Sequence, residues 1–242
     1  MTHVRIGRVK VGDAPKIVVT ITSPQNLQTI ARACQAGADI LELRLDYIAN
    51  LPVEKIISIT QKAACAAGVP IIATLRAHRE GGARRDGMMA DEPRRVALYQ
   101  ALLPYVQAVD IELACPLVHE VVANTHKKGR TVIMSYHHFH TTPALARLKA
   151  LAQLAKAKGA DVVKIVTTTR TPVEMNRLFT LLHDRPVWPI AAFSTGPHAL
   201  LSRLMSWFFQ SSLIYAGLPG KTVPGQPDIN RVKGMLKHFG LR

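Results

Sequence analysis

Lys164 is the residue of this chain whose surroundings most favour reactive chemistry. It stands inside 161–168 (DVVKIVTT), a run of mostly apolar and β-branched residues typical of a buried strand. Lysine is almost never fully buried without a partner or a task. Burial favours the uncharged amine, which attacks ketones and aldehydes to form an imine. The residues alone leave a second interpretation open, in which Lys164 reaches solvent or pairs with an interior carboxylate.

A histidine closes the preceding strand candidate. His137 ends the run 131–137, and its ordinary pKa near neutrality suits it to move a proton. Positive charge from nearby arginines would further favour the uncharged amine of Lys164. Together the two residues indicate imine formation followed by removal of a proton beside the former carbonyl. A purely structural strand-end histidine is the alternative.

Charged side chains share one face of another strand candidate. Side chains alternate across a strand, so Glu42, Arg44 and Asp46 point to one side and the intervening leucines to the other. Further charges stand on the two following strands: Arg76, Asp110 and Glu112. A charged interior is costly unless the charges pair or bind something polar. Interior salt bridges that only fix the barrel are one possibility, but strand carboxyl ends form barrel active sites and favour a substrate site.

Short β-branched runs alternate with amphipathic segments along the whole chain. The predicted strands are 16–21, 39–46, 70–76, 108–113, 131–137, 161–168, 187–194 and 211–218. The predicted helices are 25–36, 53–67, 91–106, 116–128, 143–158, 171–183, 198–208 and 228–239. Start signals precede several helices, at Asp91, Thr142, Thr171 and Asp228. This order predicts an α/β protein with one (β/α)8 TIM barrel domain over residues 1–242, whose bottom residues 1–12 could close as a short hairpin.

Composition narrows the class of partner. The 242 residues carry a net charge of +15, which suits either nucleic acid or an anionic small molecule. Aromatic residues are only 5% of the chain and no basic motif interleaves with them, so nucleic acid is the weaker expectation. No apolar run is long enough for a membrane span, and the first residues lack a signal core, so we expect a cytoplasmic protein. Three scattered cysteines indicate neither a disulfide nor a zinc framework.

The residues above fall into a known pattern. The chain resembles the type I 3-dehydroquinate dehydratases, Schiff-base lyases of the shikimate pathway of aromatic amino acid biosynthesis, over essentially its full length. The matching stretches are 14–20 (APKIVVT), 39–46 (DILELRLD), Arg76 with 80–82 (EGG), 135–139 (SYHHF) with Thr142 and Pro143, 160–164 (ADVVK), Ser202 with Arg203, and 224–226 (PGQ). Each stretch is short, but their order and spacing together are specific.

The resemblance implies a role for each matching residue. Lys164 would form the imine with 3-dehydroquinate, and His137, oriented by Glu80, would remove the C2 proton and help the C1 hydroxyl leave as water. This syn elimination would yield 3-dehydroshikimate. Arg203 would hold the substrate carboxylate through two hydrogen bonds from its guanidinium. The remaining expected substrate-binding residues are Glu42, Arg44, Arg76, Thr222 and Gln226, and residues 219–227 would form a lid.

The resemblance also implies that no metal or organic cofactor is needed, and relatives suggest a homodimer. Five positions depart from the family pattern: His138, Phe193, Thr195, Tyr215 and Thr222. Substrate packing and rate depend on these changes, whereas the reaction does not. The family has members in aromatic biosynthesis and in quinate breakdown, and the resemblance is common to both roles.

Three rival functions remain at this stage. A metal-dependent barrel hydrolase could use the cluster of His137, His138 and His140, of which the last two share a strand face. Another Schiff-base enzyme such as an aldolase could use Lys164, although Arg203 with the 224–226 motif suits a carboxylate better than a phosphate. A basic binding scaffold without catalysis is the third.

Overall fold

Parallel strands arranged in a ring form the frame that holds the predicted site residues. The computed structural model describes residues 4–83, 86–184, 187–220 and 226–241. Within them, one sheet of eight strands runs in the order β10-β3-β4-β5-β6-β7-β8-β9. Its strands are β3 (Lys16–Ile21), β4 (Ile40–Arg44), β5 (Ile71–Thr74), β6 (Ala108–Glu112), β7 (Thr131–His138), β8 (Val162–Thr168), β9 (Ile190–Thr195) and β10 (Leu213–Ala216). The backbone N–H of Ser212 donates to the carbonyl of Ile190 at 2.7 Å, which brings the last strand beside β9 and nearly closes the ring.

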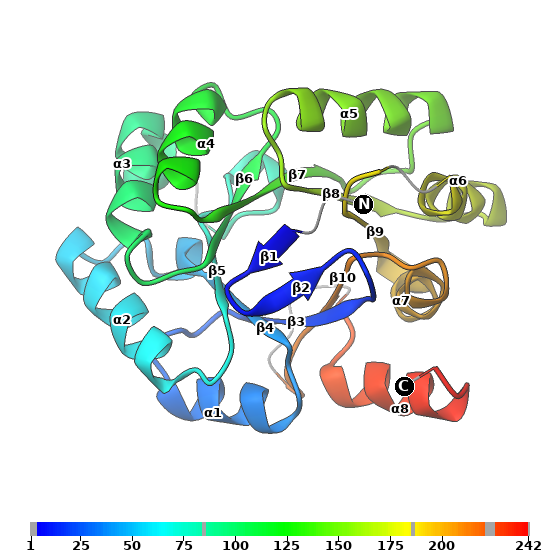
Figure 1. The fold of residues 1–242 in the computed structure, drawn as a ribbon, viewed down its shortest axis with the longest axis horizontal. Helices are drawn as coiled ribbons and strands as arrows, with labels where there is room; N and C mark the ends of the chain where they lie inside the picture. Colours follow the sequence, from blue (N-terminus) through cyan, green and yellow to red (C-terminus); the bar gives the residue numbers. More distant parts are fainter. Residues whose placement is uncertain (1–3, 84–85, 185–186, 221–225, 242) are drawn as a thin grey trace.

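Helices form a layer around this ring (Figure 1). They are α1 (Leu27–Gln35), α2 (Val53–Ala66), α3 (Glu92–Leu102), α4 (Val118–Lys127), α5 (Leu145–Ala157), α6 (Pro172–His183), α7 (Ala199–Phe208) and α8 (Ile229–His238). Short 3-10 turns are η1 (Leu45–Ile48), η2 (His78–Glu80), η3 (Gly87–Ala90) and η4 (Gly196–His198). The predicted (β/α)8 barrel is confirmed. None of the helices in the described part of the chain is both long and apolar enough to cross a bilayer.

Two apolar cores stabilise the barrel. The larger lies between the sheet and the helices and contains Leu41, Leu43 and Leu45, as strand alternation predicts. The smaller fills the floor of the barrel interior, where side chains of the strands meet Ile6 and Val11. Above this floor the interior becomes polar, so the apolar core supports a charged layer.

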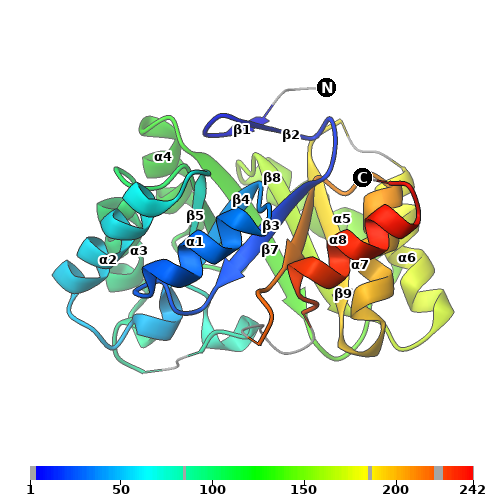
Figure 2. The ribbon, with the colours of Figure 1, turned by 90° about the horizontal axis from the view of Figure 1, so that it is seen from below.

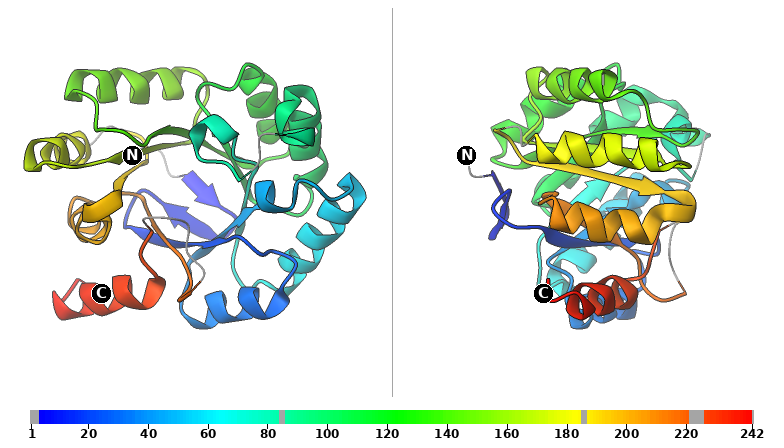
Figure 3. Two further views of the ribbon diagram at one scale, coloured as in Figure 1. Left: turned by 180° about the vertical axis from the view of Figure 1, so that it is seen from behind. Right: turned by 90° about the vertical axis from the view of Figure 1, so that its right-hand side faces the viewer.

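An antiparallel hairpin covers one end of the ring. Its strands, β1 (Val4–Ile6) and β2 (Val9–Val11), lie across the ring opening in Figure 1 and at one end of the barrel in Figure 2. Ile6 and Val11 are buried in the floor core. The predicted hairpin at the barrel bottom is therefore present. Figure 3 (left) views the ring from the other end, with the hairpin behind it.

Local start signals were correct at three of the four predicted helix starts. The side chains of Asp91, Thr171 and Asp228 each accept a hydrogen bond from a first-turn N–H of α3, α6 and α8. The prediction at Thr142 was wrong. Helix α5 begins at Leu145 with no side-chain cap, and the Thr142 hydroxyl instead bonds Thr167 and the carbonyl of Thr168.

Candidate active site

A cavity of about 500 Å³ opens at the carboxyl ends of the strands. Every predicted site residue that the structure describes lines it: Glu42, Arg44, Arg76, Glu80, His137, Lys164, Arg203 and Gln226. Thr222 and residues 221–225 of the expected lid lie outside the described residues. The carboxyl-end position is where barrel enzymes place their chemistry.

Lys164 lies deep in this cavity. It is in the middle of β8 and only 4% exposed, so its predicted burial is confirmed. Its Nζ lies 2.9 Å from Asp110 Oδ2 and 3.4 Å from Glu42 Oε1, and 3.9 Å from the centre of the Tyr215 ring. From the sequence, a reactive amine and a lysine paired with a carboxylate were two alternative interpretations of Lys164. The geometry joins them, since the same nitrogen faces the cavity and is held by two carboxylates.

The two carboxylates are themselves anchored. Glu42 accepts from the hydroxyls of Thr20 at 2.9 Å and Thr74 at 3.0 Å. Asp110 Oδ1 accepts from Arg76 at 2.5 Å and from Ser135 at 2.7 Å. Burial would raise the pKa of Asp110, but the charges of Arg76 and Lys164 hold it well below its ordinary value. Asp110 is therefore ionised.

Arg76 and Arg44 are engaged with acidic residues of the protein. Arg76 donates to Glu112 at 3.0 Å as well as to Asp110. Arg44 forms two hydrogen bonds of 2.8 Å with Asp46. The alternative of interior salt bridges therefore describes these two arginines, which nevertheless reach the cavity. The predicted strand 39–46 was too long, because β4 ends at Arg44. Asp46 lies buried in the turn η1, where it pairs with Arg44.

His137 and Glu80 form a close pair. Glu80 Oε2 lies 2.9 Å from His137 Nδ1 and accepts the His137 backbone N–H at 3.1 Å. When Glu80 is ionised its carboxylate can only accept, so it then assigns the ring proton to Nδ1 and leaves the lone pair on Nε2. Burial, together with the charges of Arg76 and Lys164, lowers the pKa of His137 well below its ordinary value. The imidazole is therefore neutral, as a base must be.

Glu80 is held by a tight turn and has an unusual acidity. Burial, with some help from Glu112 and against the charge of Arg76, raises the pKa of Glu80 to about 7. The turn η2 that carries it folds back closely on itself. A Cβ on Gly82 would lie 2.0 Å from the carbonyl oxygen of Arg76, so only glycine fits there.

Arg203 differs from the other arginines of the cavity. It comes from α7, is 1% exposed, and stacks over the Phe193 ring at 4.4 Å. Its hydrogen bonds go to backbone carbonyls, those of Tyr215 and Ala199 at 3.2 Å each and that of Ser194. Among the described residues no carboxylate pairs with it. Burial lowers the pKa of Arg203 to about 9, which still leaves it charged at neutral pH.

The remaining wall contains positions that depart from the family pattern. The hydroxyl of Thr195 bonds that of Thr168 at 3.0 Å, which adds polar groups to the cavity. Tyr215 packs its ring on Phe193, and its buried hydroxyl has no partner among the described residues. Gln226 donates to Thr20 at 3.0 Å, while its Oε1 is buried without a partner in the described structure.

Sequence reasoning missed two polar residues that support the site from outside the ring. Arg95 and Tyr99 lie one turn apart on α3, and both are fully buried. Arg95 bonds Glu112 at 2.7 Å, and the Tyr99 hydroxyl bridges the Leu75 N–H and the Asp110 carbonyl. A break in the apolar spacing of this helix was the only signal available.

The histidine cluster of the metal hydrolase alternative does not assemble a site. His138 Nδ1 lies 2.8 Å from the Thr141 carbonyl. In the part of the chain that the structure describes, no three His, Cys, Asp or Glu side chains lie where they could share a metal ion.

Among the described residues, a buried lysine, a neutral histidine and an arginine without a carboxylate partner surround one cavity of a (β/α)8 barrel, which is typical of barrel enzymes that act on carbonyl compounds through a lysine. Comparison with known proteins identifies the family within that class. The family model for type I 3-dehydroquinase matches residues 17–241. The chain belongs to the type I 3-dehydroquinase family.

Individual relatives agree with this assignment. The 3-dehydroquinate dehydratase of Methanocella arvoryzae is 31% identical over 230 residues, covering 94% of this chain and 98% of its own. That of Thermodesulfovibrio yellowstonii is 29% identical over 232 residues, with 93% and 96% covered. Among solved structures, 3-dehydroquinate dehydratase from Geobacillus kaustophilus superimposes with a TM-score of 0.90 at 24% identity, covering 99% of this chain and 96% of its own, which supports the fold.

Proposed function

We propose that this protein dehydrates 3-dehydroquinate to 3-dehydroshikimate and water by syn elimination through an imine on Lys164. The observation that carries the proposal is the shared cavity. A buried amine, a neutral imidazole and an arginine without an acidic partner line its walls. Family membership supplies the substrate and the reaction.

The first steps fall to Lys164 and His137. The Lys164 ammonium must give up a proton before it attacks, and the unprotonated His137 Nε2 is available to take it. The amine then adds to the substrate carbonyl, and the carbonyl oxygen leaves as water with one proton from the amine nitrogen and one returned by His137. The product is an iminium ion that draws electrons from the neighbouring C–H bond.

Elimination follows from the same pair. His137 Nε2 takes the proton at C2, and the C–H electron pair moves toward the iminium carbon to give an enamine. The enamine pair then expels the C1 hydroxyl, which leaves as water with the proton from His137. Hydrolysis of the new iminium restores the Lys164 amine and releases 3-dehydroshikimate. Glu80 orients the ring throughout through Nδ1.

Substrate binding would use residues from both sides of the cavity. Arg203 would pair with the carboxylate, because a buried guanidinium without an acidic partner among the described residues gains most from an anionic ligand. Substrate hydroxyls would be bound by Glu42, Arg44, Arg76, Thr222 and Gln226. Both Glu42 and Gln226 line the cavity, and the buried Gln226 Oε1 has no partner among the described residues.

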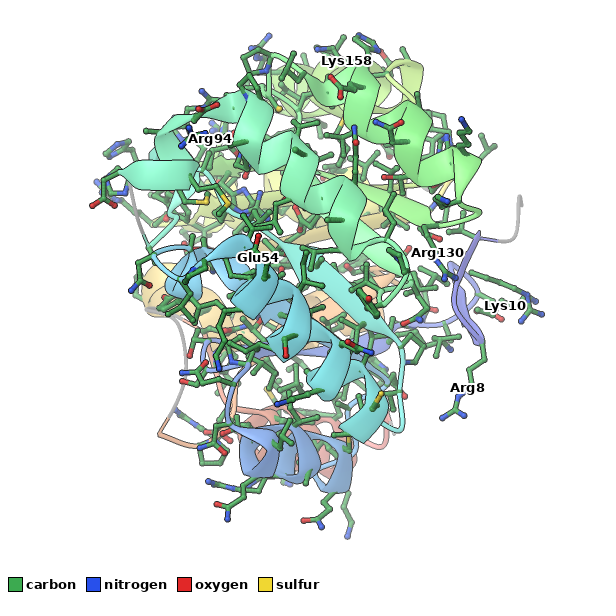
Figure 4. All side chains as sticks on the ribbon, turned by 90° about the vertical axis from the view of Figure 1, so that its left-hand side faces the viewer. Arg8, Lys10, Glu54, Arg94, Arg130 and Lys158 are labelled. Carbon is green, nitrogen blue, oxygen red and sulfur yellow. The ribbon has the colours of Figure 1, made fainter. Side chains whose placement is uncertain are left out.

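The proposal extends to the setting of the enzyme. The whole chain would act as one barrel domain and as a homodimer in the cytoplasm. The anionic substrate, rather than nucleic acid, would account for the use of positive charge. Three of the basic side chains labelled in Figure 4 belong to separate segments: Arg8 to the turn between β1 and β2, Arg94 to α3 and Arg130 to the residue before β7.

The test combines absorbance with covalent trapping. Adding 3-dehydroquinate to the purified protein should produce the absorbance of a conjugated enone. Borohydride added during turnover should leave a stable adduct on Lys164, located by peptide mass spectrometry, and a Lys164→Ala variant provides the matched control. Intact folded protein that gives neither signal overturns the proposal. Stoichiometric zinc in the same preparation would favour the hydrolase alternative.

A further inference from the structure

Helix α3 lies in the outer layer, yet it inserts two polar side chains beneath the active site. Arg95 and Tyr99 are 0% and 1% exposed, although α3 is a surface helix whose Arg94 side chain is 76% exposed. Figure 4 shows Arg94 on the outer side of this helix. Burying a guanidinium is costly unless it is fully paired, so the contacts of Arg95 require an explanation.

Arg95 bridges two segments that end at the cavity. Its Nη1 donates to the carbonyl of Leu75 at 2.7 Å and to Glu112 Oε2 at 2.7 Å. Its Nη2 lies 2.7 Å from Glu92 Oε2, near the outer surface. Arg95 therefore ties the end of β5 to the end of β6 and joins both to its own helix.

Glu112 passes this constraint to the loop that carries Glu80. Its other oxygen, Oε1, accepts from the Ala77 N–H at 2.9 Å and from Arg76 at 3.0 Å. The carbonyl of Ala77 in turn accepts the N–H of Glu80 at 3.0 Å, which closes the turn η2. Glu80 then holds His137 through two bonds to one oxygen.

Tyr99 supports the same junction independently. Its hydroxyl accepts the Leu75 N–H at 2.9 Å and donates to the Asp110 carbonyl at 2.7 Å. Leu75 is thus held at both its N–H and its carbonyl by side chains of α3. Neither Arg95 nor Tyr99 lines the cavity, so neither can touch the substrate.

We propose that Arg95 is a positioning residue, which fixes the Glu80–His137 pair through Glu112 and the backbone of residues 75–77. The inference rests on the proposed dehydratase function, since it assigns His137 the role of base. It adds a residue of the helix layer to a reaction otherwise attributed to strand ends.

The charges around the pair give a readout that a merely structural role would not move. Glu80 is faced by Arg76 of the β5 end, by Asp110 and Glu112 of β6 and by His137 of β7; Lys164 of β8 and Arg44 of β4 also act on His137. Arg95 offsets the charge of Glu112. Its removal should therefore raise the pKa of Glu80, while neutralising Glu112 should lower it.

The experiment compares Arg95→Met and Glu112→Gln with Arg94→Met, an exposed neighbour on the same helix, as the control. Wild-type turnover is measured first, because its absence would count against the dehydratase function and not against this inference. In Arg95→Met we expect kcat to fall on the order of tenfold to a hundredfold through misplacement of the base. KM should stay near the wild-type value, because in the described structure the hydrogen bonds of Arg203 go to the carbonyls of Tyr215, Ser194 and Ala199, none of which belongs to α3.

The acid limb of the kcat/KM profile should move to higher pH in Arg95→Met and to lower pH in Glu112→Gln. Rates are taken per active site from borohydride trapping, so that partial unfolding does not mimic an effect. If Arg95→Met does not fold, Glu112→Gln alone decides. Folded variants with the wild-type limb and kcat within about twofold of wild type would overturn the inference.

Discussion

The two walls of the cavity treat charge in opposite ways. On the β4, β5, β6 and β8 side, Lys164, Asp110, Glu42 and Arg76 all have partners of opposite sign. On the α7 side, Arg203 has carbonyls and an aromatic ring but no acidic partner among the described residues. The charges of the first wall are therefore paired with one another within the protein. Within the described residues the second wall has no anion, and in the proposed function the substrate carboxylate would supply one.

The largest effect should come from replacing Lys164, which lies at the centre of the wall with paired charges. Lys164→Ala should lower kcat by more than about a thousandfold, because Lys164 is the only lysine among the described residues that line the cavity. It also leaves Asp110 without one of its cations, so the free energy of unfolding should fall by about 3 kcal/mol or more. Steady-state assays and urea titration measure the two effects. Residual turnover near that of wild type would exclude Lys164 as the nucleophile.

His137, which lies on β7 next to the paired wall, separates imine formation from proton removal. His137→Ala should lower kcat by roughly a hundredfold to ten thousandfold, the usual contribution of a general base. Borohydride trapping on Lys164 should still be detectable, although slower. Exchange of the C2 proton with solvent deuterium, followed by NMR, should stop in the variant. Exchange at the wild-type rate would assign the base to another residue.

Arg203 tests the unpaired wall. Arg203→Met should raise KM about a hundredfold, which corresponds to the loss of a charge-assisted pair with the substrate carboxylate. The kcat should change much less, because Lys164 and His137 keep all their contacts. Arg203→Lys should recover little, since an ammonium cannot bond both carboxylate oxygens in the same plane. An unchanged KM in both variants would place the carboxylate elsewhere.

Protonation of Glu80 should make both kcat/KM and the free energy of unfolding depend on pH. Its pKa of about 7 means that it protonates as the pH falls through neutrality and then no longer accepts from His137 Nδ1. The kcat/KM of the wild type should therefore decline below about pH 7. Glu80→Gln should lack this limb at a reduced plateau. An ordinary carboxyl ionises at a lower pH, so the folded state binds this proton more tightly. Stability should therefore decrease as the pH rises toward 7.

The smallest effect should come from Tyr215, where the two walls meet. Its ring lies under Lys164 and against Phe193, but its hydroxyl is buried without a partner among the described residues. Tyr215→Phe keeps the ring and removes the unpaired hydroxyl. We expect the free energy of unfolding to rise by about 1 kcal/mol, with kcat within about threefold of wild type. Thermal denaturation and assay measure both; a clear loss of stability would reveal a partner for the hydroxyl.

The sequence predicted the framework and most of the site because both depend on local regularity. Alternation along β4 placed Glu42 inside and Leu41 outside, and the order of the strands placed His137 of β7 and Lys164 of β8 in one cavity. It could not predict the partners of Lys164. Asp110 lies 54 residues away, and only the register of β6, β7 and β8 brings its oxygen to 2.9 Å.

Arg95 escaped prediction for a related reason. Beside Arg94 it reads as one of two exposed charges on an amphipathic helix, and adjacent helical residues differ by only part of a turn. Which of the two enters the core depends on Glu112, an acceptor on a strand far along the chain. Asp46 was assigned to a strand because the alternation continued past Arg44, but the chain enters the turn η1 there and Asp46 pairs with Arg44.

The N-terminal hairpin has a consequence for traffic through the enzyme. Ile6 and Val11 seal the floor of the barrel, and the carbonyl of Arg5 is tied to Thr131 of β7. Substrate and product would therefore enter and leave through the opening at the carboxyl ends of the strands. The product must leave before the next substrate can bind, so product inhibition should be competitive with substrate.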